Sequence, residues 1–210
     1  MSERLPTRRA IPRLVVVTDR HAIGGRDLVD VVRAALDAGL PAVQLREKDL
    51  PGGPLLALAE RLRAATTRAG ALLFINDRVD VAIACGADGV HLGGTSMPVA
   101  AARALLPPGA LIGVSTHAPE ELAATAADFA FFGPVHATPS KAAFGPPQGE
   151  GRLRAAIGTA RVPVLAIGGV TAATAAGVRA AGAAGAAVIR AILDAPDPGA
   201  ATRALLDALG

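Results

Sequence analysis

The chain has 210 residues, of which 51% are hydrophobic and only 2% aromatic, with neither Trp nor Tyr. This length suits one domain with a sizeable core, and the scarcity of aromatic rings argues against a platform for stacking nucleobases. The formal net charge of +3 comes from scattered arginines rather than from a basic stripe. We therefore expect no nucleic-acid partner and a small anionic ligand instead.

Export and membrane signals are not evident in the sequence. Residues 1–12 form a basic tail without an apolar core segment, and we expect residues 13–210 to form the folded domain. The longest uncharged run, 162–178, contains Pro163 and two adjacent glycines, so we do not expect it to span a membrane. The single cysteine, Cys85, cannot form an internal disulfide. These features predict a cytoplasmic protein without membrane contact, and they leave open whether it forms a homo-oligomer.

Short apolar, β-branched runs alternate with Ala-rich stretches of helical spacing along the whole chain. Strands are predicted at 14–18, 42–46, 72–76, 89–92, 111–115, 129–133, 164–167 and 187–190. Helices are predicted at 27–38, 54–69, 78–85, 98–106, 119–126, 151–159, 172–181 and 199–209. Eight alternating units favour an α/β fold that closes as a (β/α)8 TIM barrel. An open doubly wound sheet is the alternative, but the glycine spacing of a dinucleotide-binding turn does not follow the first strand.

The stretch 42–49, AVQLREKD, begins as a buried strand and ends in charge. Side chains alternate along a strand, so Gln44, Arg46 and Lys48 share one face and would meet an anion at the strand end. Lys48 and Lys141 are the only lysines in a chain that otherwise uses arginine for its cations. Because an ammonium and a guanidinium are not interchangeable toward phosphate, we interpret both lysines as functional.

In barrel enzymes the chemistry lies at the carboxyl ends of the strands, and polar residues follow most of the predicted strands here. Asn76 and Asp77 end the strand at 72–76, and Asp77 is interpreted either as a helix N-cap or as an oxygen ligand of Mg²⁺. His91 ends the next strand. Ser115 and His117 follow, and they form at most a weak signal for acyl hydrolysis because no nucleophile-elbow motif surrounds them.

Two later segments predict phosphate contacts. The long loop 133–147 offers Thr138, Ser140 and Lys141, although a solvated loop would have a similar composition. The adjacent Gly168 and Gly169 precede a helix, which is typical of a phosphate cradle, although they could also serve only a tight turn. Arg190, expected at the end of the last strand, favours the anion-binding interpretation.

In this order, the motifs QLREK, NDRVDVAIACGADGVHLG, IGVSTHAPEE, GPVHATPSK, AIGG and AVIRAI resemble the thiamine phosphate synthase and thiazole tautomerase superfamily. Proteins of the synthase type join hydroxymethylpyrimidine diphosphate to thiazole phosphate and release diphosphate. The resemblance implies diphosphate contacts from Gln44, Arg46, Lys48, Asn76 and Lys141. It further implies Mg²⁺ at Asp77, pyrimidine contacts at His91 and Ser115, and thiazole phosphate contacts at Thr138, Ser140, Gly168, Gly169 and Arg190. The expected catalytic residues are Lys141, Ser115 and His117.

The sequence departs from the synthase pattern at two places. Where synthases carry a second metal-binding aspartate after the fourth strand, this chain reads GGTSMP, with Gly94 and Ser96 in place of Gln and Asp. Arg190 stands where the family commonly has Ser. The missing aspartate is also a property of the tautomerase branch, in which His117 would shuttle a proton. A non-catalytic barrel that binds a phosphorylated ligand is a third interpretation, whereas the complete QLREK motif and Asp77 favour the synthase.

Overall fold

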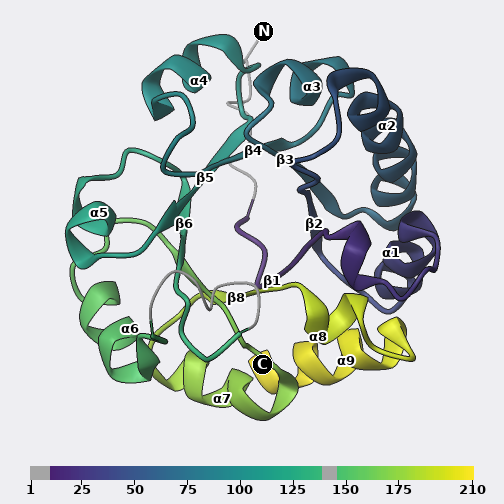
Figure 1. Ribbon diagram of the computed structural model, residues 1–210. Coiled ribbons are helices and arrows are strands. Elements are labelled where there is room, and N and C mark those ends of the chain that lie inside the picture. The colour runs from purple at the N-terminus through teal and green to yellow at the C-terminus, as the bar shows by residue number, and fades with distance from the viewer. Residues whose placement is uncertain (1–9, 139–145) are drawn as a thin grey trace, which may run out of the picture.

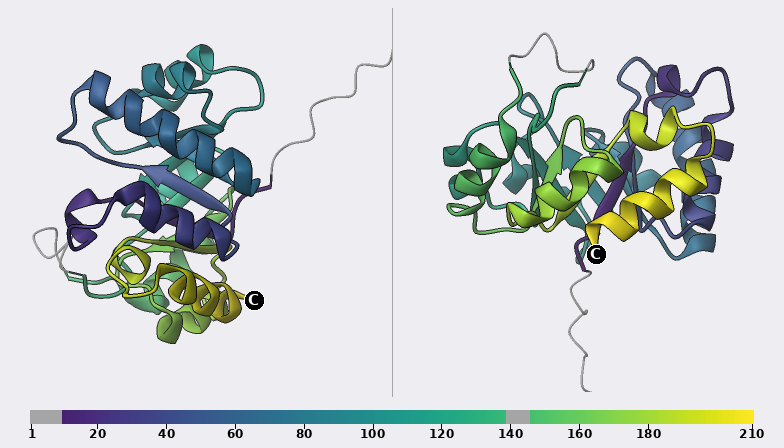
Figure 2. Two further views of the ribbon diagram at one scale, coloured as in Figure 1. Left: turned by 90° about the vertical axis from the view of Figure 1, so that its right-hand side faces the viewer. Right: turned by 90° about the horizontal axis from the view of Figure 1, so that it is seen from below.

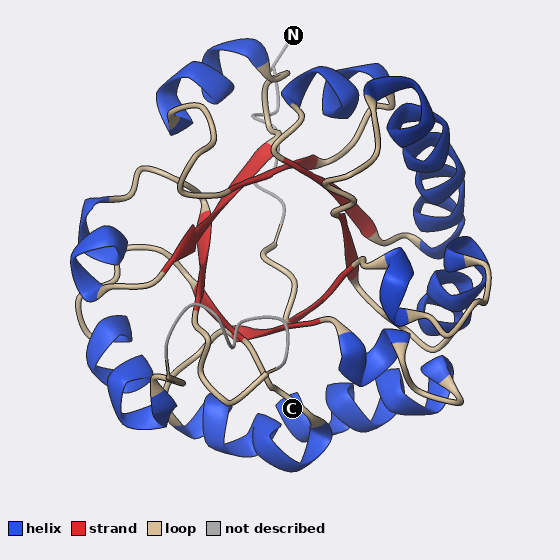
Figure 3. Ribbon diagram, in the orientation of Figure 1, coloured by secondary structure: helices blue, strands red, loops and turns tan. Residues whose placement is uncertain are grey.

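The computed structural model describes residues 10–138 and 146–210, in which parallel strands close into a barrel surrounded by helices (Figure 1; Figure 3). The strands are β1 (Leu14–Val17), β2 (Ala42–Leu45), β3 (Leu72–Asn76), β4 (Gly89–Leu92), β5 (Leu111–Thr116), β6 (Phe129–Phe132), β7 (Val164–Ile167) and β8 (Gly185–Val188). They pair in chain order, and β8 pairs with β1 through partners such as Ala187 and Val15. The predicted (β/α)8 barrel is confirmed.

The helices outside the barrel begin with η1 (Arg20–Ala22), α1 (Leu28–Asp37), α2 (Gly52–Ala69), α3 (Val79–Ala84) and α4 (Val99–Leu105). They continue with α5 (Pro119–Ala124), α6 (Gly149–Ile157), α7 (Ala172–Ala180), α8 (Arg190–Leu193) and α9 (Pro198–Leu209). Helix α9 contacts both α1 and α7, so it completes the outer ring between the two ends of the chain (Figure 1; Figure 2). No helix in the described ranges is both long and apolar enough to cross a bilayer.

The sequence prediction for the last strand was wrong. Strand β8 ends at Val188, Ile189 is the N-cap of α8, and Arg190 is the first residue of that helix rather than the last of a strand. The apolar run AAVIRAIL continues through both elements, so hydrophobicity alone does not locate the boundary between them. Helices η1 and α8 were likewise not predicted, because one turn of helix is too short to show a periodic pattern.

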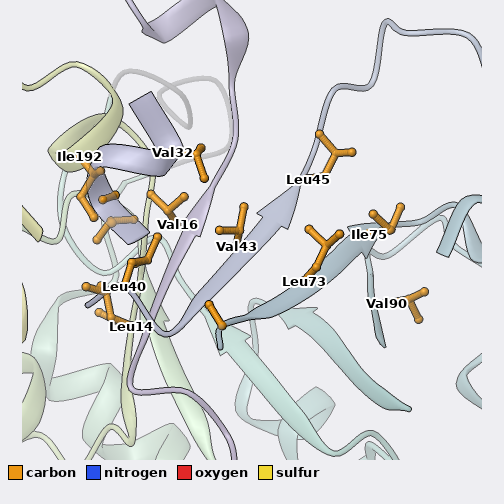
Figure 4. Close-up of a cluster of buried hydrophobic side chains, with 14 of the residues drawn as sticks. Leu14, Val16, Val32, Leu40, Val43, Leu45, Leu73, Ile75, Val90 and Ile192 are labelled. Atoms are coloured by element: carbon orange, nitrogen blue, oxygen red, sulfur yellow. The ribbon is translucent and has the colours of Figure 1, made fainter. Parts of the chain in front are cut away.

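Alternation along the strands divides the core into two layers. Inward side chains such as Val15, Phe74 and Phe131 fill the barrel interior. The alternate residues pack against the helices, and Figure 4 shows part of this outer layer, including Val16 and Val43. The same alternation directs residues two positions beyond the inward core residues toward the barrel axis at the carboxyl ends of the strands.

Candidate active site

The ends of β2 and β3 are joined by buried polar side chains. Gln44 is 2% exposed, and its Nε2 donates a hydrogen bond to Oδ1 of Asn76 at 3.1 Å. Its carbonyl oxygen, Oε1, is buried and finds no partner within residues 10–138 and 146–210. Thr18, fully buried after β1, accepts a hydrogen bond from the backbone N–H of Arg46 at 2.8 Å. A buried amide oxygen without a partner is costly, so Oε1 of Gln44 is an unused hydrogen-bond acceptor at this end of the barrel.

An open pocket of about 210 Å³ lies beside this pair. Its lining includes Lys48, Asn76 and Asp77, together with Leu45, Glu47, Leu50, Leu55 and Arg78. Lys48 is exposed to solvent. Lys48, Asn76 and Asp77, which were predicted to meet at the ends of β2 and β3, line this pocket together. Gln44 lies within β2 and contacts Asn76, and Arg46 directly follows β2. Neither Gln44 nor Arg46 is among the residues that line the pocket.

Asp77 has a φ of 69°, the only positive φ at a non-glycine residue in the described chain. Its backbone N–H donates to the carbonyl oxygen of His91 at 3.0 Å, which fastens the end of β3 to β4. The N-cap of α3 is Arg78, and no side chain caps that helix. The interpretation of Asp77 as a helix cap is therefore wrong. A left-handed aspartate is strained, and such strain is concentrated at functional sites.

His91 lies inside the barrel with 2% exposure. Its Nε2 is 3.0 Å from Oγ of Ser115, and its ring centroid lies 4.1 Å from that of Phe131 at an interplanar angle of 30°. Burial, with a smaller contribution from the positive charge of Arg46, lowers the pKa of His91 to about 3. The imidazole is therefore neutral at physiological pH, and His91 and Ser115, the two residues expected to contact the pyrimidine, lie in contact with each other.

Gly113 provides the space that this histidine occupies. A Cβ at position 113 would lie 2.6 Å from Nδ1 of His91 and 2.4 Å from Cζ of Phe129. Both contacts are far shorter than real Cβ contacts, so any side chain here would displace the imidazole. Sequence reasoning missed this residue, although an isolated glycine inside a strand is a known signal of close approach.

His117 does not form a pair with Ser115. Strand β5 ends at Thr116, and His117 turns into the following loop, where its Nδ1 donates to the carbonyl oxygen of Gly133 at 2.6 Å. Gln148 Nε2 donates to the same carbonyl at 3.2 Å. Since Ser115 contacts His91 instead, the arrangement gives no support to acyl hydrolysis.

The paired glycines after β7 meet the loop after β6. Gly168 and Gly169 have φ values of 96° and 64°, and the carbonyl oxygen of Gly168 accepts from the N–H of His136 at 2.9 Å. A Cβ on Gly169 would lie 2.5 Å from the carbonyl oxygen of Ala137. Both positions thus require glycine for conformation and for close packing, not for a tight turn alone.

The remaining residues expected around the thiazole phosphate have different outcomes. Thr138 is half-buried at the end of the described part of this loop, while Ser140 and Lys141 lie outside the described residues. Arg190 is exposed at the start of α8, where its Nη1 is 3.8 Å from Oδ2 of Asp194. The expected strand-end position of Arg190 is therefore corrected.

Two carboxylates, Asp77 and Glu47, line the pocket, and Glu47 is already bound by Arg20. In the residues that the structure describes, no cluster of three or more His, Cys, Asp or Glu side chains could hold an ion by itself. Ser96, in place of a second aspartate, uses its Oγ to accept a hydrogen bond from the N–H of Gly93 at 2.6 Å. Mg²⁺ commonly binds through one or two carboxylates plus waters and substrate phosphates. Asp77 at the pocket therefore supplies one oxygen ligand of the kind that Mg²⁺ uses.

Comparison with known proteins identifies the family. The model of the thiamine monophosphate synthase family matches residues 14–192. A putative thiamine-phosphate synthase of Geobacter sulfurreducens is 54% identical over 196 residues, covering 92% of each chain. A thiamine-phosphate synthase of Roseiflexus castenholzii is 47% identical over 96% of this chain and 89% of its own. The solved thiamine phosphate pyrophosphorylase of Pyrococcus furiosus has a TM-score of 0.85 and 36% identity over 94% of this chain and 95% of its own. The chain belongs to the thiamine monophosphate synthase family.

Proposed function

We propose that the protein is a thiamine phosphate synthase that joins hydroxymethylpyrimidine diphosphate to thiazole phosphate and releases diphosphate. The proposal rests on the family match and on one structural observation. Lys48, Asn76 and Asp77 line a single pocket at the carboxyl ends of β2 and β3. A cation, an amide and a carboxylate at one barrel rim suit a diphosphate that carries a divalent ion.

The reaction needs a site that favours charge on a leaving diphosphate. The bond between the pyrimidine CH₂ and the diphosphate oxygen breaks, the oxygen keeps the electron pair, and the thiazole nitrogen donates its own pair to the CH₂ carbon. Arg46 and Lys48 would hold the diphosphate, and Asp77 would hold Mg²⁺. The bound ion supplies further neutralisation of the growing negative charge. Fixed cations that meet charge as it develops lower the barrier more than they tighten ground-state binding.

The pyrimidine ring is placed deeper, against the barrel interior. His91 is neutral because of its low pKa, so it serves as a polar contact beside Ser115 rather than as a cation. The unpartnered Oε1 of Gln44 is a second acceptor at this depth. Gly168, Gly169 and Thr138 cradle the thiazole phosphate.

We extend the thiazole phosphate cradle to Ser140, Lys141 and Arg190, with Lys141 reaching the leaving diphosphate. For these three residues the proposal rests on sequence alone. The small phosphorylated substrates are then the partners of this rim.

The tautomerase and the non-catalytic barrel gain no support from the relatives described above, which carry synthase names. His117 nevertheless distinguishes the tautomerase from the synthase, because the tautomerase would need it to transfer a proton. The residue is exposed, and its Nδ1 is held by the carbonyl oxygen of Gly133.

Incubation of the purified protein with both substrates and Mg²⁺ tests the proposal. Thiamine phosphate and diphosphate are expected in equal amounts, and chelation of Mg²⁺ should abolish both. If neither product forms, and the protein instead isomerises carboxythiazole phosphate in a reaction lost in His117→Ala, the synthase assignment is contradicted.

A further inference from the structure

Cationic and acidic residues alternate in the loop after β2, so acidic side chains lie next to the cations of the proposed diphosphate site. Arg46 and Lys48, which meet the diphosphate in the proposed function, are interleaved with Glu47 and Asp49. Glu47 lines the same pocket as Lys48. A carboxylate that faced the pocket would repel a bound diphosphate. A carboxylate that paired with Lys48 would neutralise the cation that the diphosphate needs.

Both carboxylates are instead occupied by one residue from the neighbouring β1 loop. The backbone N–H of Arg20 donates to both carboxylate oxygens of Glu47 at 3.2 Å, and its Nη1 lies 3.3 Å from Oε2. The same Nη1 donates to Oδ1 of Asp49 at 2.6 Å, while Nη2 donates to Oδ2. The planar guanidinium thereby spans two acidic side chains that are two positions apart.

The two carboxylates differ in burial. Glu47 is 5% exposed, and a carboxylate buried to this extent needs hydrogen-bond donors close by. Asp49 is half exposed and also meets Nε2 of His21 at 3.1 Å. The hydrogen bonds from Arg20, and then from His21, hold the pKa of Asp49 well below its ordinary value. Both carboxylates are therefore bound by Arg20.

We propose that Arg20 is a positioning residue for the diphosphate site: it binds Glu47 and Asp49 so that Arg46 and Lys48 stay free for the substrate. The inference rests on the proposed function. Arg20 acts through the two carboxylates and does not itself touch the substrate. Among the described residues, no carboxylate lies within ion-pair distance of Arg46 or Lys48, as this role requires.

The test is the Arg20→Gln variant, which removes the cation and leaves both carboxylates. The KM for the pyrimidine diphosphate is expected to rise about tenfold. A freed carboxylate would cancel the equivalent of one charge-assisted contact between the diphosphate and Arg46 or Lys48. The KM for thiazole phosphate should stay within about twofold, because its cradle lies at β6 and β7. Arg33→Gln is the matched control, since Arg33 also pairs with an aspartate, Asp30 at 3.1 Å, but on the outer helix α1.

A rescue experiment separates this electrostatic role from a structural one. Adding Glu47→Gln to Arg20→Gln removes the freed carboxylate from the pocket and should restore most of the lost affinity for the pyrimidine diphosphate. A structural tie would not be rebuilt by this second change. Arg20→Lys keeps the cation and should fall between wild type and Arg20→Gln, which provides a second variant if the first does not fold. A double variant as impaired as Arg20→Gln, or equal rises in both KM values, would overturn the inference.

Titration with inorganic diphosphate and Mg²⁺ makes the inference independent of turnover. Weaker diphosphate binding by Arg20→Gln than by wild type is expected. A wild-type protein that binds diphosphate but forms no thiamine phosphate would contradict the proposed function alone. Equal diphosphate affinity in the two proteins would contradict the role of Arg20 alone.

Discussion

At the scale of single residues, His91 shows how the barrel interior sets the chemistry of one side chain. Its ring lies between Phe131 and the backbone of Gly113, and its Nδ1 is buried without a partner in the residues that the structure describes. Low polarity around the ring disfavours the charged form, and Arg46 adds repulsion. The sequence predicted where His91 would lie, but its neutral state follows from packing that the sequence does not reveal.

A neutral buried histidine makes stability depend on pH. The folded-state pKa of His91 is about 3, whereas an unfolded histidine has a pKa of about 6.5. Between these values the unfolded chain binds a proton that the folded protein does not. The free energy of unfolding should therefore fall as the pH falls from about 6.5 toward 3, with a contribution of about 1.4 kcal/mol per pH unit.

Urea denaturation at pH 5 and pH 7 of wild type and His91→Gln measures this contribution. Wild type should lose more stability at pH 5 than the variant does. His21→Gln is the comparison for a histidine replaced outside the barrel interior, because the His21 side chain is 69% exposed. The same pH dependence in wild type and His91→Gln would show that His91 is not held neutral in the fold.

At the scale of elements, two aspartates fasten the amino ends of the strands to the helices. Oδ2 of Asp88, just before β4, accepts from the backbone N–H of Leu73 at 2.8 Å and from Arg63 of α2 at 2.6 Å. Asp128, just before β6, repeats the pattern with the N–H of Ile112 and with Arg103 of α4. These contacts tie β3 to the start of β4 and β5 to the start of β6. They lie at the barrel face opposite the site, where residues are expected to serve stability rather than chemistry.

Replacing Asp88 by Ala should destabilise the protein by about 3 kcal/mol, because it leaves a buried strand amide and an arginine without their carboxylate. Asp30→Ala is the matched control: it removes an exposed pair on α1 and should cost about 0.5 kcal/mol. Thermal or chemical unfolding checks both values. Equal small losses in the two variants would show that the amino-end tie contributes little.

The elements also show what the sequence could predict. Apolar runs bounded by polar residues located β2, β3 and β4 within a residue, because a strand buried on both faces differs sharply from its loops. The run that contains β8 and α8 has no such break, and its prediction was wrong. Contacts between distant loops, such as that of Arg20 with Glu47, leave no periodic trace in the sequence.

At the scale of the whole molecule, barrel closure explains why a site could be predicted at all. Because all the strands are parallel, their carboxyl ends lie at the same rim of the barrel and bring together residues that are far apart in sequence. Gln44 thus contacts Asn76, and His91 contacts Ser115. Strand parity selected these inward side chains. The conformation of Asp77 and the neighbours of His117 depend on loop geometry, which parity does not determine.

The account depends most on the claim that the β2 end binds the leaving diphosphate. Steady-state kinetics of Lys48→Ala test it directly, with Lys48→Arg as a comparison that keeps the charge. We predict that kcat of Lys48→Ala falls about 100-fold, since a cation that meets developing charge is lost, while the KM for thiazole phosphate changes less than about twofold. An equal loss in turnover and in thiazole phosphate affinity, or no loss in either, would contradict the claim.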